Sequence, residues 1–79
     1  MSRIQSVVFE GPRWGLNDAE KWLKDHYLKT SFNGKQVHIV RGDDGKVKQL
    51  RYRQENPTLF KYYTTKKLSN DILLILGYN

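Results

Sequence analysis

The chain has 79 residues, no cysteine and a formal net charge of +6. This length suits a single small domain covering residues 1–79, and without cysteine neither a disulfide bond nor a thiolate metal site is possible. No segment approaches the roughly 18 apolar residues of a membrane span, and the amino-terminal residues lack the apolar run of a signal peptide. We therefore expect an intracellular or particle-associated protein with no membrane partner, rather than a secreted one.

The positive charge is concentrated in residues 46–67, which we call the basic stretch. It contains seven lysines and arginines and a single acid, Glu55, whereas the other seven basic side chains are balanced by seven acids. The same stretch contains four aromatic residues: Tyr52, Phe60, Tyr62 and Tyr63. A cationic, aromatic stretch in an otherwise neutral chain indicates an anionic partner, of which nucleic acid is the commonest kind.

The first predicted elements are a strand and a helix. Residues 3–9 are rich in β-branched and aromatic side chains and precede a Gly-Pro pair, which predicts a strand. Apolar side chains within residues 16–27 recur with the period of one helix face, and we expect this helix to fray near Lys29. Asn17, followed three places later by Glu20, is typical of a capping box at the helix start.

A β-hairpin is predicted next. Residues 37–41 and 46–54 flank a Gly-Asp-Asp-Gly turn. With the Asp-Gly pair at the centre of the turn, Ile39 faces Leu50 and one face of the hairpin is apolar. That apolar face consists of Val37, Ile39, Leu50 and Tyr52. The other face carries His38, Val40, Val47, Gln49, Arg51 and Arg53.

The last third of the chain is predicted to add a short second helix and a strand. Asn56-Pro57 is typical of a helix start, and Thr64-Thr65 suits an extended segment as an alternative. Residues 72–76 are apolar at every position, which indicates a strand that is covered on both faces or placed centrally. The order β-α-β-β-(α)-β predicts an α+β fold, with a three- or four-stranded, mostly antiparallel sheet and one main helix packed on one face.

A set of residues along the chain also matches a recurring pattern. The set is Trp14, the run Ala19-x-x-Trp22-Leu23-x-x-His26, the run Arg51-Tyr52-Arg53-Gln54, Pro57, Phe60 and residues 72–77. Through these residues, which span roughly residues 4–77, the chain resembles a short accessory domain of tailed-phage and large-DNA-virus proteins. The resemblance implies a viral accessory or virion-associated module, located in the host cell or the virion, and implies no biochemical role. The pattern commonly reads His-Gly where this chain has His26-Tyr27, so we expect the helix to continue by a turn.

The candidate site is a nucleic-acid-binding face on the predicted hairpin. Arg51 and Arg53 are two residues apart on a strand and therefore share a face at about 6–7 Å, near the spacing of successive phosphates. Tyr62 or Tyr63 offers a surface on which a base can stack. The candidate residues are His38, Lys48, Gln49, Arg51, Arg53, Lys61, Tyr62, Lys66 and Lys67. We expect non-specific binding of DNA or RNA through them.

Other interpretations of the same residues stay open. The chain is alternatively a structural or interaction module that docks on a viral or host protein, with Tyr62, Tyr63 and Tyr78 as anchors. The arginines also suit an ordinary solvated face, and an exposed hairpin edge would allow a homo-oligomer. We expect no enzyme activity and no cofactor, because the acids cap a helix, form a turn or stand alone. No metal site is predicted either, since no acid cluster or thiol lies beside His26 or His38 in the sequence.

Overall fold

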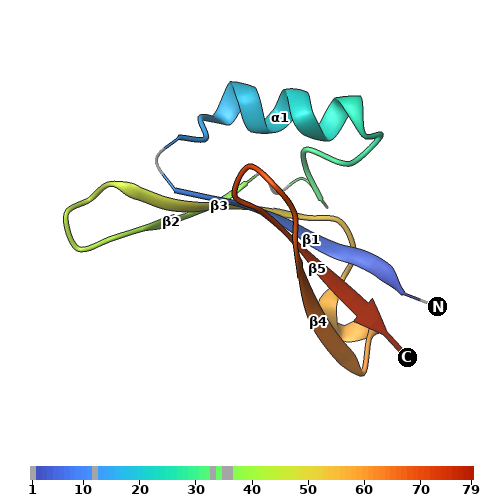
Figure 1. Ribbon diagram of the computed structural model, residues 1–79. Helices are drawn as coiled ribbons and strands as arrows, with labels where there is room; N and C mark the ends of the chain where they lie inside the picture. The colour runs from blue at the N-terminus through green and yellow to red at the C-terminus, as the bar shows by residue number, and fades with distance from the viewer. Residues whose placement is uncertain (1, 12, 33, 35–36) are drawn as a thin grey trace.

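The computed structural model describes residues 2–11, 13–32, 34 and 37–79, and within them it shows an α+β fold of five strands and one α-helix. The elements are β1 (Arg3–Glu10), α1 (Leu16–Asp25), β2 (His38–Arg41), β3 (Val47–Arg53), the 3₁₀ turn η1 (Pro57–Leu59), β4 (Tyr62–Lys67) and β5 (Ile72–Tyr78). The strands form one antiparallel sheet in the order β2-β3-β1-β5-β4, so β1 lies between two hairpins. Helix α1 lies across one face of this sheet (Figure 1). None of the described helices is long and apolar enough to span a membrane.

The α+β class is confirmed, but the expectation of three or four strands is wrong. After Pro57 the chain makes a single 3₁₀ turn, in which the Asn56 side chain accepts a hydrogen bond from the Thr58 N–H at 3.0 Å. The next residues then form β4, which pairs with β5 along its whole length. The β-forming sequence Tyr-Tyr-Thr-Thr favours this extended conformation over a second helix.

The core lies between α1 and the sheet. Among the described residues it contains seven buried side chains: Val7, Phe9, Ala19, Leu23, Leu50, Tyr52 and Ile72. Trp14 covers one end of this cluster, with its ring centroid 4.8 Å from that of Phe9 and its Nε1 donating to the backbone oxygen of Asn70 at 2.7 Å. We call the side of the sheet that faces α1 the helix face and the other side the open face.

The amino end of α1 differs from the predicted capping box. The N-cap is Gly15, and no side chain makes a capping hydrogen bond there. Leu16 is the first helical residue, so Asn17 already lies inside the first turn. A capping residue needs a non-helical backbone, and Asn17 therefore cannot cap together with Glu20.

The carboxyl end of α1 is also earlier than predicted. The helix ends at Asp25, and Tyr27 adopts a left-handed backbone conformation with φ 57°. The Tyr27 N–H donates to the Lys24 oxygen at 3.1 Å and the Leu28 N–H donates to the Leu23 oxygen at 2.8 Å. These two bonds form a Schellman motif, in which the left-handed position usually holds glycine. The expected extra helical turn is therefore wrong, because the motif forms with tyrosine at that position.

The turn between β2 and β3 differs from the predicted Asp-Gly turn. Its hydrogen bond runs from the Gly45 N–H to the Gly42 oxygen at 2.9 Å, which places Asp43 and Asp44 at the centre. Gly45 follows in the left-handed conformation, with φ 78°. This is a three-residue hairpin loop, in which glycine supplies the positive φ that the loop requires.

A bulge on β3 restores the predicted register beyond this turn. Lys48 is an extra residue between two ladder pairs, so Ile39 faces Leu50 as predicted. The bulge also changes which way Val47 points, and Val47 packs against the core cluster. The prediction that Val47 lies on the face of the arginines is therefore wrong.

Gln54 ties the segment after α1 to the end of β3. Its side chain is only 5% exposed, and its Oε1 accepts from the Lys29 N–H at 2.7 Å while its Nε2 donates to the Lys29 oxygen at 2.8 Å. Its backbone N–H donates to the Gln5 oxygen at 2.7 Å. The paired bonds hold the segment that carries Phe32 beside the sheet.

Candidate nucleic-acid interface

The open face of the sheet carries the predicted arginines in two neighbouring cross-strand rows. The first row runs, strand by strand, through His38, Arg51, Val8, Leu73 and Lys67. The second row runs through Arg53, Ser6, Ile75 and Thr65. Directly opposed residues of a ladder share a face, so the first row has cationic side chains near both edges and apolar ones in its middle.

The centre of the open face is apolar and lies on the side of the sheet away from α1. Val8 is only 1% exposed, so its neighbours already bury it, and the half-buried Leu73 and Ile75 are the apolar groups that solvent still reaches. Arg51 and Arg53 are both exposed beside this centre, and successive rows along a strand lie about 6–7 Å apart. The open face therefore combines an apolar centre with a pair of exposed guanidinium groups.

Neither Arg51 nor Arg53 forms an ion pair within the described ranges. The ion pairs found there join Arg3 to Glu55 at 3.7 Å and Arg13 to Asp71 at 3.2 Å. The Arg51 Nη1 donates to the side-chain oxygen of Gln49 at 3.4 Å, and this neutral acceptor does not neutralise the charge of Arg51. Exposed cations that no carboxylate neutralises attract anions from solution.

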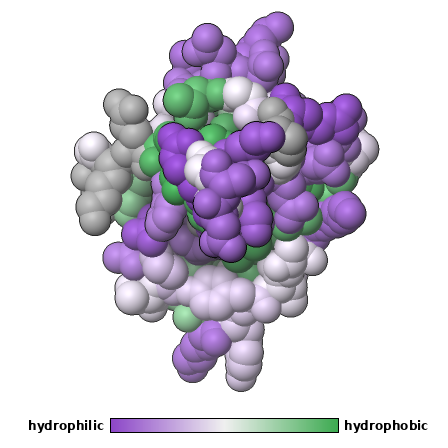
Figure 2. All heavy atoms as spheres, turned by 90° about the vertical axis from the view of Figure 1, so that its left-hand side faces the viewer, coloured by the Kyte–Doolittle hydropathy of each residue, from purple (hydrophilic) through white to green (hydrophobic). Residues whose placement is uncertain are grey.

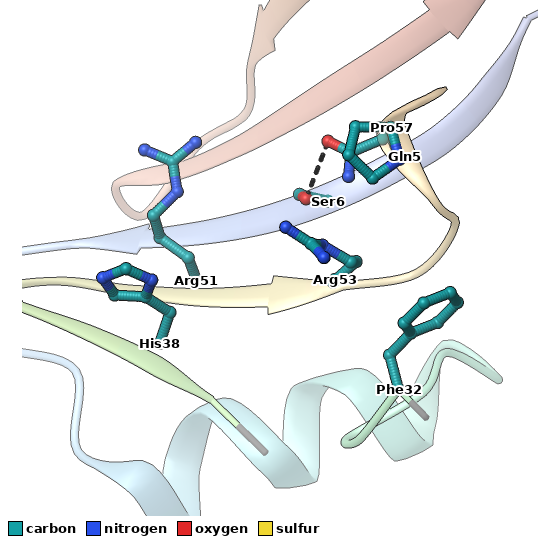
Figure 3. A pocket seen from close by; sticks show the side chains of 7 residues that line it. All are labelled: Gln5, Ser6, Phe32, His38, Arg51, Arg53 and Pro57. Atoms are coloured by element: carbon teal, nitrogen blue, oxygen red, sulfur yellow. Dashed lines mark hydrogen bonds between the residues drawn. The ribbon is translucent and has the colours of Figure 1, made fainter. Parts of the chain in front are cut away.

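The two arginines and His38 border a hollow of about 290 Å³ on the open face. The other lining residues are Gln5, Ser6, Phe32 and Pro57. In Figure 3, His38 and Arg51 lie together at one end, Phe32 and Pro57 lie toward the other end, and Arg53 lies between them. Cationic and aromatic groups from three separate parts of the chain thus share one depression.

The most deeply buried residues of this hollow already have hydrogen-bond partners. Gln5 and Ser6 are both buried. The Ser6 Oγ donates to the Gln5 Oε1 at 2.8 Å, and the Gln5 Nε2 donates to the Glu55 backbone oxygen at 3.1 Å. Because these polar groups are satisfied, the groups that remain available to a ligand are mainly the cations and the Phe32 ring.

The other predicted site residues are divided between the two faces by the alternation of β4. Lys67 lies on the open face with its partner Leu73. Lys66 pairs with Leu74, which packs against the core, so Lys66 lies on the helix face. Tyr62 lies four residues before Lys66 on the same strand, so the alternation of side chains places it on the helix face as well. The structure therefore does not bring Tyr62 and Lys66 together with the arginines.

Lys48 and Gln49 lie at the other end of the open face, in a less basic environment. Together with Glu10 and Asp71 they border a second hollow, whose two carboxylates oppose an anion.

Lys61 is exposed just before β4, and its backbone N–H donates to the Tyr78 oxygen at 2.9 Å. Viewed from the end of the β2–β3 hairpin, hydrophilic side chains dominate, and hydrophobic atoms show mainly in the gaps between them (Figure 2).

The sequence reasoning missed an aromatic cluster at the opposite end of the open face. The Phe60 ring packs over Gly77, and its centroid lies 6.1 Å from that of Tyr63 and 5.3 Å from the Arg3 guanidinium carbon. Tyr63 pairs with Gly77 and donates a hydrogen bond to the Pro57 oxygen. In the sequence, Gly77 is the residue that indicates this cluster, because a glycine inside a strand often marks the close approach of another group.

Two further observations concern chemistry at other places in the fold. Among the described residues, no group of three His, Asp or Glu side chains is placed to hold a metal ion. Burial raises the pKa of Tyr52 to about 12, and the negative charge of Glu20 acts in the same direction. Tyr52 belongs to the core, so this shift bears on stability and not on the open face.

No protein-family model, no curated protein and no solved structure matches this chain.

Proposed function

We propose that this protein binds nucleic acid, DNA or RNA, through its open face, with Arg51 and Arg53 contacting phosphates. The observation that carries the proposal is the pair of exposed guanidinium groups, two residues apart on β3, that no described carboxylate neutralises. Arginine suits this role because its planar fork donates two parallel hydrogen bonds to a phosphate. Phosphate contacts carry no base information, so the binding is non-specific.

The position of Lys67 also supports the proposal. Lys67 and Arg51 belong to the same cross-strand row, three strand intervals apart. At about 4.8 Å per interval, the two charges lie about 14 Å apart across the sheet. A phosphate backbone that crosses the strands therefore meets cations on both sides of the apolar centre.

The test is a salt titration of binding to a labelled oligonucleotide of mixed sequence, followed by fluorescence anisotropy. If three cations contact phosphates, log K falls with log salt at a slope of about −2 to −3. The affinity then drops about 20- to 40-fold between roughly 50 and 200 mM salt. An affinity that stays flat over this range would overturn the proposal.

A charge-reversal pair locates the binding to the open face. Arg51→Glu combined with Arg53→Glu is expected to abolish measurable binding, while circular dichroism shows an intact fold because both side chains are exposed. The matched control combines Lys21→Glu with Lys24→Glu, which makes the same change in net charge on exposed positions of α1. If both variants lose affinity equally, net charge alone governs binding and the open face is not the site.

The apolar centre of the open face favours a second candidate function, a docking surface for a viral or host protein. Leu73 and Ile75 lie half-buried beside the arginines, and Tyr63 is exposed at the same face. Tyrosine and arginine are enriched in the energetically dominant parts of protein interfaces. This candidate predicts that the salt titration detects no binding of nucleic acid even at low salt.

A further inference from the structure

We propose that the open face takes single-stranded nucleic acid in preference to duplex, with one unpaired base seated in the hollow beside Phe32. This inference rests on the proposed function and names the class of nucleic acid. Three features carry it: the apolar centre of the open face, the composition of the hollow, and a second group of aromatic rings near the Arg53 end of the hollow.

The apolar centre fits unpaired bases better than a double helix. A duplex turns its phosphates outward and keeps its base faces stacked inside, so a sheet surface that lies against it meets a charged backbone. Leu73 and Ile75 would then lie against phosphates with no apolar partner. A single strand exposes the faces of its bases, which pack on apolar and aromatic side chains while the phosphates reach the flanking cations.

The hollow has the size and the composition of a binding site for one nucleotide. Its volume of about 290 Å³ is close to the lower end of small-ligand sites, about 300 Å³. The Phe32 ring forms part of the wall, and the Lys29 ammonium lies 5.4 Å from its centroid. A base can stack on this ring while Arg53, in the same wall, binds the adjoining phosphate.

A second aromatic group lies farther along the same face. Phe60 and Tyr63 meet edge to face, at a 75° angle between their rings, and Tyr63 is 44% exposed. In the order of the cross-strand rows, the row of Gly77 and Tyr63 adjoins the row of Arg53, and the row of Arg51 and His38 lies beyond it. A strand that leaves the hollow at the end where Pro57 lies therefore meets this further aromatic surface, since Tyr63 is hydrogen-bonded to Pro57.

The first test compares single strand with duplex at one salt concentration. Labelled oligomers of about 12 nucleotides are long enough, since comparable single-strand sites cover about 4–16 nucleotides. Single-stranded DNA and RNA of mixed sequence are expected to bind at least about 5-fold more tightly than a duplex of the same sequence, because at least one base-stacking contact is lost in the duplex. A duplex that binds as tightly as the single strand overturns this inference and leaves the proposed function standing. Absence of binding by every probe at low salt overturns the proposed function itself.

The second test removes the aromatic ring while it preserves apolar volume. Phe32→Leu is expected to weaken single-strand binding about 5- to 150-fold, with the salt slope and the weak duplex binding unchanged. Phe32→Trp keeps a stacking surface and is expected to retain the affinity. Tyr62→Leu is the matched control, because Tyr62 is 67% exposed and lies on the helix face. Equal losses for single strand and duplex in the folded Phe32→Leu variant would show that the hollow does not hold a base.

Discussion

Tyr27, just after α1, holds a left-handed backbone conformation although its side chain is 97% exposed. This conformation costs a residue with a Cβ atom about 1–2 kcal/mol. The chain accepts it because the Tyr27 and Leu28 N–H groups thereby reach the last carbonyl oxygens of the helix. The exposed ring has few contacts that could offset the backbone cost.

Replacing this residue with glycine is therefore expected to stabilise the protein. Tyr27→Gly should raise the free energy of unfolding by about 1 kcal/mol, because glycine adopts positive φ without a steric penalty. Chemical denaturation measures the change. Tyr27→Ala is the control, since alanine removes the ring but retains the backbone cost. A gain from alanine equal to that from glycine would contradict the backbone explanation.

Tyr52 provides a prediction about pH. Its side chain is 2% exposed, burial raises its pKa to about 12, and the charge of Glu20 adds to the effect. An unfolded tyrosine has a pKa of about 10, so between roughly pH 10 and pH 12 the unfolded chain loses a proton that the folded chain keeps. The contribution of Tyr52 to stability is therefore complete below about pH 10 and is lost as the pH rises toward 12. The loss amounts to about 2–3 kcal/mol.

The corresponding measurement compares unfolding free energies of the wild type and Tyr52→Phe over this pH range. Phenylalanine has no proton to lose, so the variant is expected to lack this part of the alkaline decline. Among the described residues the Tyr52 hydroxyl has no hydrogen-bond partner, so its removal should not destabilise the protein at neutral pH. Tyr62→Phe, at a largely exposed position, should follow the wild-type profile. Parallel curves for all three proteins would refute the assignment to Tyr52.

At the scale of elements, the contact between Phe60 and Gly77 joins the segment after η1 to β5. A Cβ atom at Gly77 would lie 2.3 Å from the nearest atom of the Phe60 ring. The ring cannot move away freely, because the Arg3 guanidinium and the Tyr63 ring lie against it. The segment between η1 and β4 therefore packs on β5 at a position where no side chain fits.

Gly77→Ala is expected to lower the free energy of unfolding by about 1–3 kcal/mol, the usual cost of overpacking. A double-mutant cycle isolates the contact. In a Phe60→Ala background the same alanine at position 77 should cost little, because the ring it would strike is gone. A Gly77→Ala effect of the same size in both backgrounds would show that the Phe60 contact is not its cause.

At the scale of the whole molecule, the basic stretch does not form one surface. Lys66 and Lys67 are neighbours in sequence, yet β4 places Lys67 on the open face and Lys66 on the helix face. The net charge is the same whichever of the two is removed. Comparing variants of Lys66 and Lys67 therefore separates the effect of net charge on nucleic-acid binding from the effect of which face carries the charge.

Lys67→Ala is expected to make the salt slope of nucleic-acid binding less steep by about 1, because one phosphate contact is lost. Lys66→Ala should leave the slope close to that of the wild type. Anisotropy titrations at several salt concentrations measure both values. Equal changes in the two variants would exclude the open face as the place where phosphates bind.

Local periodicity in the sequence was enough to determine the α+β class, the position of α1 on one face and the pairing of Ile39 with Leu50. It also indicated that Arg51 and Arg53 share a face, since alternation along a strand needs no knowledge of distant residues. These properties follow from the apolar period of single helices and strands and, for Ile39 and Leu50, from the apolar alternation on the two arms of one hairpin. Their physical basis is the fixed repeat of the helix and the strand.

Long-range pairing decided the rest, because it sets which segments meet and how each one ends. The fifth strand forms because β4 pairs with β5. The bulge at Lys48 lets the three-residue hairpin loop coexist with the register in which Ile39 faces Leu50. Phe32 reaches the hollow because the segment that carries it is fastened to Gln54, 25 residues beyond Lys29. No local sequence pattern predicts these long-range contacts, because they stabilise the fold only once the whole sheet has assembled.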